Sequence, residues 1–175
     1  MYGMFGFSNA ISLDLTSFDT SNVTDMEKMF DSSLATEIRG LDKLDTSNVT
    51  NMNGMFRSSN VSILNLNSFN TLNVTTMREM FSEAKAVIID LSSFDTSKVT
   101  NMFRMFYKSS NLQTIYASDK FNVDNVTNDG WMFLYNYKLQ GGAGTKYYDN
   151  SPNDKNRARI DGGTDSPGYF TLKNN

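Results

Sequence analysis

The chain has 175 residues, of which 39% are hydrophobic and 20% are charged, and it contains neither cysteine nor histidine. These absences exclude disulfides and thiolate zinc sites and remove the commonest general base, so we expect a protein that is not an enzyme and uses no cofactor. The net charge of −3 argues against a nucleic-acid partner, and the sequence has no apolar run of about 18 residues that could span a membrane.

A phrase of 13 residues recurs along the chain at a nearly constant spacing. Its first copy runs from Phe18 to Phe30 and reads FDTSNVTDMEKMF, and further copies begin at Leu44, Phe69, Phe94 and Phe121. The valine of each copy stands at 23, 49, 74, 99 or 126, so the steps are 26, 25, 25 and 27 residues. Self-similarity at this period predicts a solenoid, here with about five coils of about 25 residues.

The first residues of the chain fit a later part of the repeat. Met1–Phe5 align with Met102–Phe106, which lie in the last piece of a coil. A solenoid needs a cap over its terminal core, and none is visible in this part of the sequence. We therefore expect a fragment of a longer protein, with an open N-terminal coil that can self-associate.

Each coil begins with a short strand of alternating apolar residues. Leu13, Leu64, Ile89 and Ile115 mark four of these strands, and we expect one parallel sheet with one strand per coil. The second coil carries one additional residue after its strand, which we interpret as a bulge near Gly40.

A polar turn follows each strand and places an aspartate or asparagine at the same position of every coil. Two interpretations of this column are open: a ladder of Asx turns that satisfies backbone amides, or a calcium site built from carboxylates. Asparagine at two of the five positions favours the Asx turns. The column comprises Asp19, Asp45, Asn70, Asp95 and Asn122.

The last piece of each coil predicts a very short helix, which makes the expected fold class α/β. Thr24 is a suitable N-cap, and Glu27 stands three residues on, as in a capping box. Met26, Met29 and Phe30 then fall on one helical face. We expect these methionines and phenylalanines, together with the valines of the repeat, to form buried columns.

The periodicity stops after the last copy, where Trp131 replaces a polar residue. We interpret this tryptophan as local repacking of the last coil rather than as a ligand platform. The chain is accordingly divided into a repeat solenoid, residues 1–138, and a small β cap, residues 139–175, made of short strands joined by Gly/Pro turns. The glycine-rich segment 141–144 lacks the lysine and following helix of a phosphate-binding loop, so we expect a turn.

The repeated phrase and the C-terminal segments GGAGTKY and ARIDGGT resemble the BspA-like leucine-rich-repeat surface proteins of bacteria, which include a repeat family of mycoplasma lipoproteins. This resemblance implies an α/β solenoid of leucine-rich-repeat type that is displayed on a bacterial cell or outside it. It also implies adhesion to protein partners, such as host matrix or cell-surface proteins, and no shared catalytic residues.

The outward side of the strands is the predicted recognition surface. Its residues vary from coil to coil while the inward positions stay apolar, which is typical of a binding face, although drift on an unconstrained solvent face is the alternative. Ile63 and Ile88 favour binding, because apolar side chains are costly to leave exposed. The predicted binding residues are Asp14, Arg39, Ile63, Asn65, Ile88, Asp90 and Tyr116, and Ser12, Glu37 and Thr114 complete the second of the two rows.

We therefore expect a non-enzymatic binding module, a fragment of a bacterial surface adhesin that recognises host or neighbouring-cell proteins. The alternative is a structural spacer or a self-associating array of repeats. A repeat stabilised by bound cations is a third hypothesis.

Overall fold

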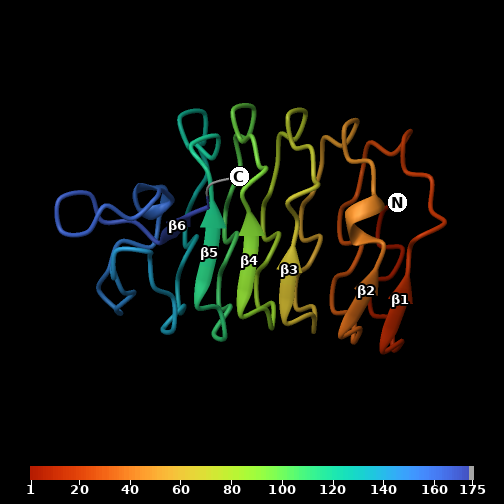
Figure 1. Cartoon of the computed structure of the whole chain (residues 1–175), viewed down its shortest axis with the longest axis horizontal. Helices are drawn as coiled ribbons and strands as arrows, with labels where there is room; N and C mark the ends of the chain where they lie inside the picture. Colours follow the sequence, from red (N-terminus) through yellow and green to blue (C-terminus); the bar gives the residue numbers. More distant parts are fainter. Residues whose placement is uncertain (174–175) are drawn as a thin grey trace.

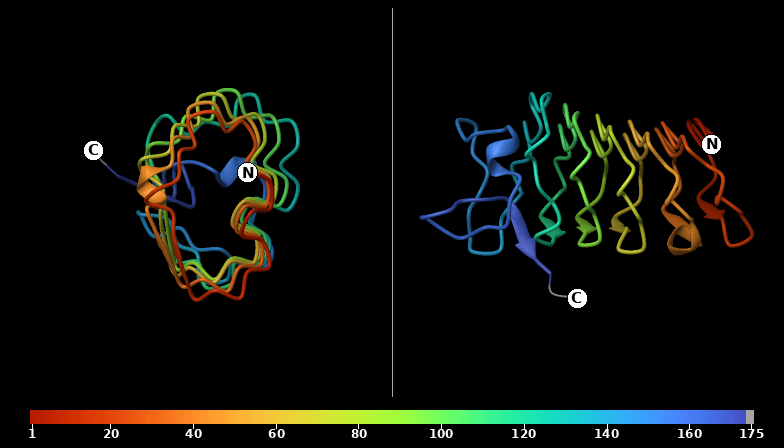
Figure 2. Two further views of the ribbon diagram at one scale, coloured as in Figure 1. Left: turned by 90° about the vertical axis from the view of Figure 1, so that its right-hand side faces the viewer. Right: turned by 90° about the horizontal axis from the view of Figure 1, so that it is seen from above.

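The computed structural model describes residues 1–173 and shows a parallel β-solenoid of about four turns, each stacked on the next (Figure 1). In the end view, successive turns follow nearly the same outline (Figure 2). Residues 174 and 175 of the expected cap lie outside the described residues. The strands are β1 (Ser12–Asp14), β2 (Glu37–Arg39), β3 (Ile63–Asn65), β4 (Ile88–Leu91), β5 (Thr114–Ala117) and β6 (Phe170–Leu172).

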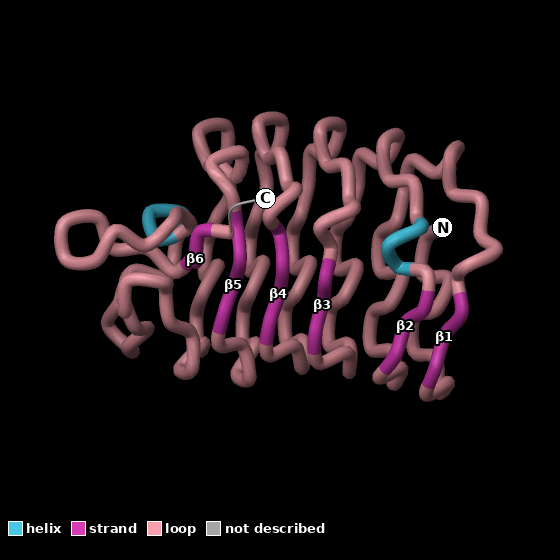
Figure 3. The backbone as a smooth tube through the Cα atoms, in the orientation of Figure 1, coloured by secondary structure: helices cyan, strands magenta, loops and turns pink. Residues whose placement is uncertain are grey.

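The strands form two parallel sheets, so the expectation of a single sheet is wrong. β1 pairs with β2, and the other four strands form a sheet in the order β3-β4-β5-β6. The break between β2 and β3 falls where the second coil has its additional residue, and the short 3-10 helix η1 (Leu41–Lys43) lies there (Figure 3). Gly40 precedes η1 with a φ of 74°, and a Cβ on it would come within 2.7 Å of the Thr16 nitrogen. The expected bulge is therefore a tight turn that requires glycine.

The short helices expected in each coil are absent, and within residues 1–173 the only helices are η1 and a second 3-10 turn, η2 (Lys155–Arg157). The N–H groups of Met26, Lys28 and Phe30 donate to carbonyl groups of the next coil at 2.8–3.0 Å. A helix capped by Thr24 would have bonded the N–H groups of Lys28 and Phe30 within its own coil, so pairing between coils replaces it. The helical half of the expected α/β class is thus wrong.

Polar ladders connect the turns. The Ser21 N–H donates to Asp19 Oδ1 at 3.0 Å, and the same Asx turn recurs at every member of the aspartate and asparagine column. The threonines in the column of Thr24, which was expected as an N-cap, bridge coils instead. Thr50 Oγ1 donates to the Thr24 carbonyl at 3.2 Å, and similar bonds follow along the stack. The column is therefore explained by Asx turns, and within residues 1–173 no three acidic side chains are grouped so that they could hold a metal ion.

The core consists of columns of identical side chains, as the repeat predicts. Phe30, Phe56, Phe81, Phe106 and Phe133 are fully buried and stack face to face, with centroid distances of 5.2–5.9 Å. The methionines of the repeat are buried beside them. The valine column is buried from the second copy onward, whereas the first valine is only half-buried.

The C-terminal segment covers the last turn. β6 pairs in parallel with β5 and brings Tyr169 and Phe170 into the core. Phe170 meets Phe121 edge-on at 4.9 Å, and Tyr169 meets Phe133 edge-on at 5.1 Å. The face-to-face column therefore ends against rings turned roughly perpendicular to it, which is a favourable aromatic arrangement. Within residues 139–173, β6 is the only strand of the expected cap, while Gln140 and Lys146 form an isolated antiparallel bridge.

One carboxylate holds the loops of this segment together. Asp161 is 8% exposed and accepts hydrogen bonds from the N–H groups of Ala143 and Thr145, both at 2.9 Å, and from Thr145 Oγ1 at 2.7 Å. The N–H groups of Gly163 and Gly168 also donate to it, at 3.0 and 3.3 Å. Burial raises the pKa of Asp161, but these hydrogen bonds outweigh it and lower the pKa to about 2. The GGAGT and ARIDGGT segments are thus joined by a hydrogen-bond network centred on Asp161.

Candidate binding site

The strand register places the predicted recognition residues in two outward rows. Ser12 lies opposite Glu37, and Asp14 opposite Arg39, on β1 and β2. On the larger sheet one row runs Ile63, Ile88, Thr114 and the other runs Asn65, Asp90, Tyr116. Because β2 and β3 are not paired, each row is divided into an N-terminal and a C-terminal part.

The N-terminal part of the face is charged and exposed. Arg39 Nε lies 3.0 Å from Glu37 Oε1, and Thr16 donates to Asp14 Oδ1 from both its N–H and its hydroxyl group. These hydrogen bonds hold the pKa of Asp14 below its ordinary value. All of these side chains are well solvated, so this part of the face offers charge but little apolar contact area.

The C-terminal part of the face mixes apolar and polar side chains. Ile63 is 61% exposed, and its neighbour Ile88 is half-buried. The carboxylate of Asp90, by contrast, is buried and bonded to the Lys173 ammonium and the Ser92 N–H. Burial raises the pKa of Asp90, but these two partners outweigh it and leave the pKa below its ordinary value. Asp90 is therefore engaged within the chain, whereas Ile63 is available to a partner.

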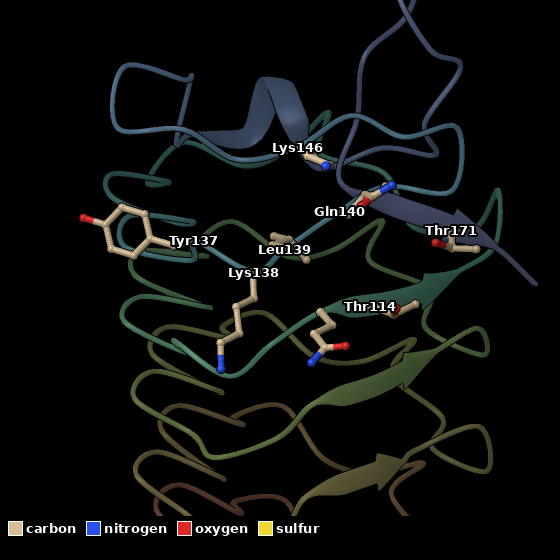
Figure 4. Close-up of a pocket in the computed structure, with 9 residues that line it drawn as sticks. Thr114, Tyr137, Lys138, Leu139, Gln140, Lys146 and Thr171 are labelled. Atoms are coloured by element: carbon tan, nitrogen blue, oxygen red, sulfur yellow. The ribbon is translucent and has the colours of Figure 1, made fainter.

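A groove of about 490 Å³ lies where this face meets the C-terminal segment (Figure 4). Thr114 at the start of β5 and Thr171 on β6 lie on its strand side, and Tyr137 lies at its opposite margin. Leu139 is buried in its wall, and two amides and two ammonium groups give it polar character. The remaining lining residues are Gln113, Lys138, Gln140, Gly141 and Lys146.

Sequence reasoning identified only one member of this groove, Thr114, through its position in the second row. Residues 137–146 lie beyond the last copy of the repeat, so no column predicts where their side chains point. Lys138 and Lys146 come from segments that meet only after the chain has folded back on itself, as Gln140 and Lys146 do in their antiparallel bridge.

The groove continues the outer face and is lined by polar groups suited to hydrogen bonding. Its polar groups are amides, hydroxyls and ammonium groups from Lys138 and Lys146, and none of the carboxylates of residues 1–173 lines it. Such groups can bind and orient a ligand by hydrogen bonds and charge. Within residues 1–173, the structure contains no helix whose length and hydrophobicity would let it cross a membrane.

The fold and its repeated polar ladders define a repeat protein of the parallel β-solenoid class. A family model described as "Mycoplasma protein of unknown function, DUF285" matches residues 1–42 and 32–145, and the chain belongs to this family. The match agrees with the mycoplasma repeat family in the resemblance drawn from the sequence. The searches of curated proteins and of solved structures found no match.

Proposed function

We propose that this protein is a non-enzymatic binding module of BspA-like type, part of a bacterial surface adhesin that recognises host or neighbouring-cell proteins. The observation that carries the proposal is the outer strand face. Its residues differ from turn to turn on a scaffold whose inward residues are nearly identical, and the face opens into a groove.

Ile63 is the centre of this proposal. It stands where the N-terminal and C-terminal parts of the row meet, 61% exposed, with Asn65 on the same strand and Ile88 beside it. Apolar side chains at the centre of a polar-rimmed face often carry much of the binding energy of a protein interface. The stacked turns keep this face rigid, so little conformational entropy is lost on binding.

The test is capture of partners from host matrix and serum proteins, followed by a Kd measurement with the purified partner. The Ile63→Ser/Ile88→Ser variant should weaken that Kd at least about tenfold, because two apolar contacts are lost. Leu72→Ser is the matched control. Leu72 is also exposed but lies in a turn where the first, second and fourth copies have serine. Equal binding by both variants would show that the partner uses another face.

Self-association is a second candidate, since four apolar side chains of the first turn are exposed: Tyr2, Met4, Phe7 and Ile11. Phe7→Ser tests it, because Ser32 and Ser58 occupy the same position in later copies with the same left-handed backbone. Sedimentation velocity should show a concentration-dependent oligomer that this variant abolishes. A monomer at all concentrations would contradict self-association and leave the adhesin hypothesis as the remaining candidate.

A further inference from the structure

Five aromatic rings gather on two stacked turn segments, one before β5 in the sequence and one after it. Phe103 and Tyr107 belong to one coil, and Trp131, Tyr135 and Tyr137 belong to the next. Their centroids are linked in a chain: Phe103 to Trp131 at 6.0 Å, Trp131 to Tyr107 at 6.5 Å, Tyr107 to Tyr135 at 5.9 Å and Tyr135 to Tyr137 at 6.2 Å. We call these five residues the aromatic cluster.

The fold does not require large side chains at these positions. Trp131 and Tyr135 adopt left-handed backbone conformations, with φ of 58° and 70°. In the second copy, Gly54 and Ser58 occupy the same two columns with φ of 60° and 53°. A bulky residue in this conformation costs free energy that glycine avoids, and Trp131 remains 47% exposed. Local repacking, which we expected from the sequence, accounts for the part of Trp131 that packs on Phe103 and Arg104, and the exposed part of the ring is available to a ligand.

Two cations lie within the cluster without a carboxylate partner. The Arg104 guanidinium is 4.5 Å from the Trp131 ring centroid and 4.9 Å from that of Tyr107, and Lys108 Nζ is 5.2 Å from that of Tyr107. Neither forms an ion pair within residues 1–173. The Nε atom of Arg104 is also buried without a hydrogen-bond acceptor.

An arginine earlier in the stack shows the contrast. Arg57 donates to both carboxylate oxygens of Asp31, at 3.0 and 2.7 Å, and Asp31 is 1% exposed. In that turn the fold neutralises its own cation. At the aromatic cluster, Arg78 lies 4.9 Å from the Phe103 centroid and is likewise paired, with Glu79. Arg104 and Lys108 lie against rings without an ion pair, which leaves their charge available to a ligand.

A hollow of about 360 Å³ lies beside the cluster, lined by Tyr107, Lys108, Ser110, Tyr135 and Tyr137. Tyr137 also lines the groove of Figure 4, so the two cavities share a wall. An elongated ligand could therefore contact rings and a cation at one end and the amides of Gln113 and Gln140 at the other.

We propose that the aromatic cluster binds an acidic oligosaccharide that carries a single carboxylate. The apolar CH face of a sugar ring packs well on tyrosine and tryptophan rings, while hydroxyl groups bond to Ser110 and to the neighbouring groove. Arg104 and Lys108 supply the counter-charge for the carboxylate. The two unpaired cations beside the rings match one carboxylate at the aromatic end of the ligand, and the net charge of −3 disfavours a long polyanion such as nucleic acid.

This site goes beyond the proposed protein-binding face, because it lies on the turn segments rather than on the outward strand rows. The two proposals fail separately. Loss of protein binding in the Ile63→Ser/Ile88→Ser variant says nothing about sugar binding, and the variants below leave that face unchanged.

The experiment measures binding of 3′-sialyllactose, with neutral lactose beside it, by ligand-observed NMR titration of the purified chain. We expect a Kd on the order of 1 mM for 3′-sialyllactose and binding of lactose at least about fivefold weaker. Trp131→Gly/Tyr135→Ser should weaken the acidic sugar about tenfold, and Lys108→Ser should weaken it about fivefold and remove most of the preference over lactose.

These variants copy residues that stand in the same columns of other turns, so each should fold. Lys28→Gly is the matched control, since it removes a cation from the column of Arg104 and Trp131 in the first copy and should bind like the wild type. Circular dichroism melting checks the fold of every variant.

Four outcomes would overturn the proposal. They are no binding at 10 mM sugar, equal affinity for lactose, unchanged affinity in the folded Trp131→Gly/Tyr135→Ser variant, and tighter binding of a polyanion at physiological salt. A heparin tetrasaccharide and a ten-residue oligothymidylate are the polyanion probes. Preference for the first would assign a sulfated glycan site, and preference for the second a single-stranded nucleic-acid site.

Discussion

The repeat turns and the C-terminal segment are stabilised in opposite ways. In the turns, each contact exists in several copies: the phenylalanine stack, the Asx turns and the threonine bonds all connect one coil to the next. In the C-terminal segment, single groups hold the chain: Asp161 joins residues 143–145 to its own loop, and Phe170 closes the core. A destabilising substitution in one turn should therefore also destabilise the neighbouring turns, whereas one in the C-terminal segment should affect that segment alone.

The largest effect is expected inside the phenylalanine stack. Phe81 is fully buried between Phe56 and Phe106, at centroid distances of 5.9 and 5.5 Å. Phe81→Ala should lower the free energy of unfolding by about 3–5 kcal/mol, because it leaves a cavity that stacked turns cannot close. Urea denaturation measures the loss. Hydrogen exchange should accelerate in the turns on both sides of residue 81, and a purely local increase would contradict the comparison.

The next largest loss of stability is expected in the hydrogen-bond network around Asp161 in the C-terminal segment. Asp161→Asn should cost about 2–3 kcal/mol, because a neutral amide cannot replace a carboxylate that accepts five hydrogen bonds. Exchange should accelerate in residues 139–173 while the turns stay protected. Asp165→Asn, an exposed carboxylate of the same loop, is the control and should change little.

The same carboxylate predicts a pH dependence. Its pKa is about 2 in the folded chain, against an ordinary value of 3.8. A group whose pKa is lowered by folding stabilises the folded state at any pH above its pKa in the unfolded chain. This stabilisation, about 2 kcal/mol, should therefore be lost as the pH falls from about 4 towards 2. Urea midpoints across this range measure it. The Asp161→Asn variant should lose less stability over the same range, and an unchanged slope would place the effect on other carboxylates.

A smaller effect is expected from one rung of a ladder. Thr46 is buried, donates to the Asn70 carbonyl at 3.0 Å and accepts from the Asn70 N–H at 2.8 Å. Thr46→Val keeps the shape and should cost about 1–2 kcal/mol, because the Asn70 groups lose a buried partner. Thr50→Val is the control: its hydroxyl is exposed, so a loss below about 0.5 kcal/mol is expected. Equal losses would mean that burial does not set the strength of these bonds.

The buried columns of the core could be predicted from the sequence because the same apolar residues recur in every copy of the repeat. The backbone conformation between these residues could not be predicted. Met26, Met29 and Phe30 have a spacing that suits one face of a helix, yet it also suits a chain that turns at left-handed Lys28 and pairs with the next coil. Those hydrogen bonds join residues about 25 positions apart, and no local pattern records them.

The candidate sites show the same limit. Ile63 and Ile88 could be placed on one face because strand alternation and the repeat fix their register. The aromatic cluster requires Tyr107 to meet Trp131 across two coils, which is visible only when the copies are superposed rather than analysed singly. The groove depends on a segment without any repeat, so its lysines carried no positional signal.

The smallest expected effect is on the outer face, where the turns should tolerate change. Ile63→Ser/Ile88→Ser should keep the free energy of unfolding within about 1 kcal/mol of the wild type, because Ile63 is exposed and Ile88 is only half-buried. Leu64→Ala is the contrast on the same strand: Leu64 is fully buried, and the cavity should cost about 2–4 kcal/mol. Thermal melting and urea denaturation of both variants measure the difference. If the serine variant lost as much stability as Leu64→Ala, the two isoleucines would belong to the core, and the outer face could not be separated from the fold that supports it.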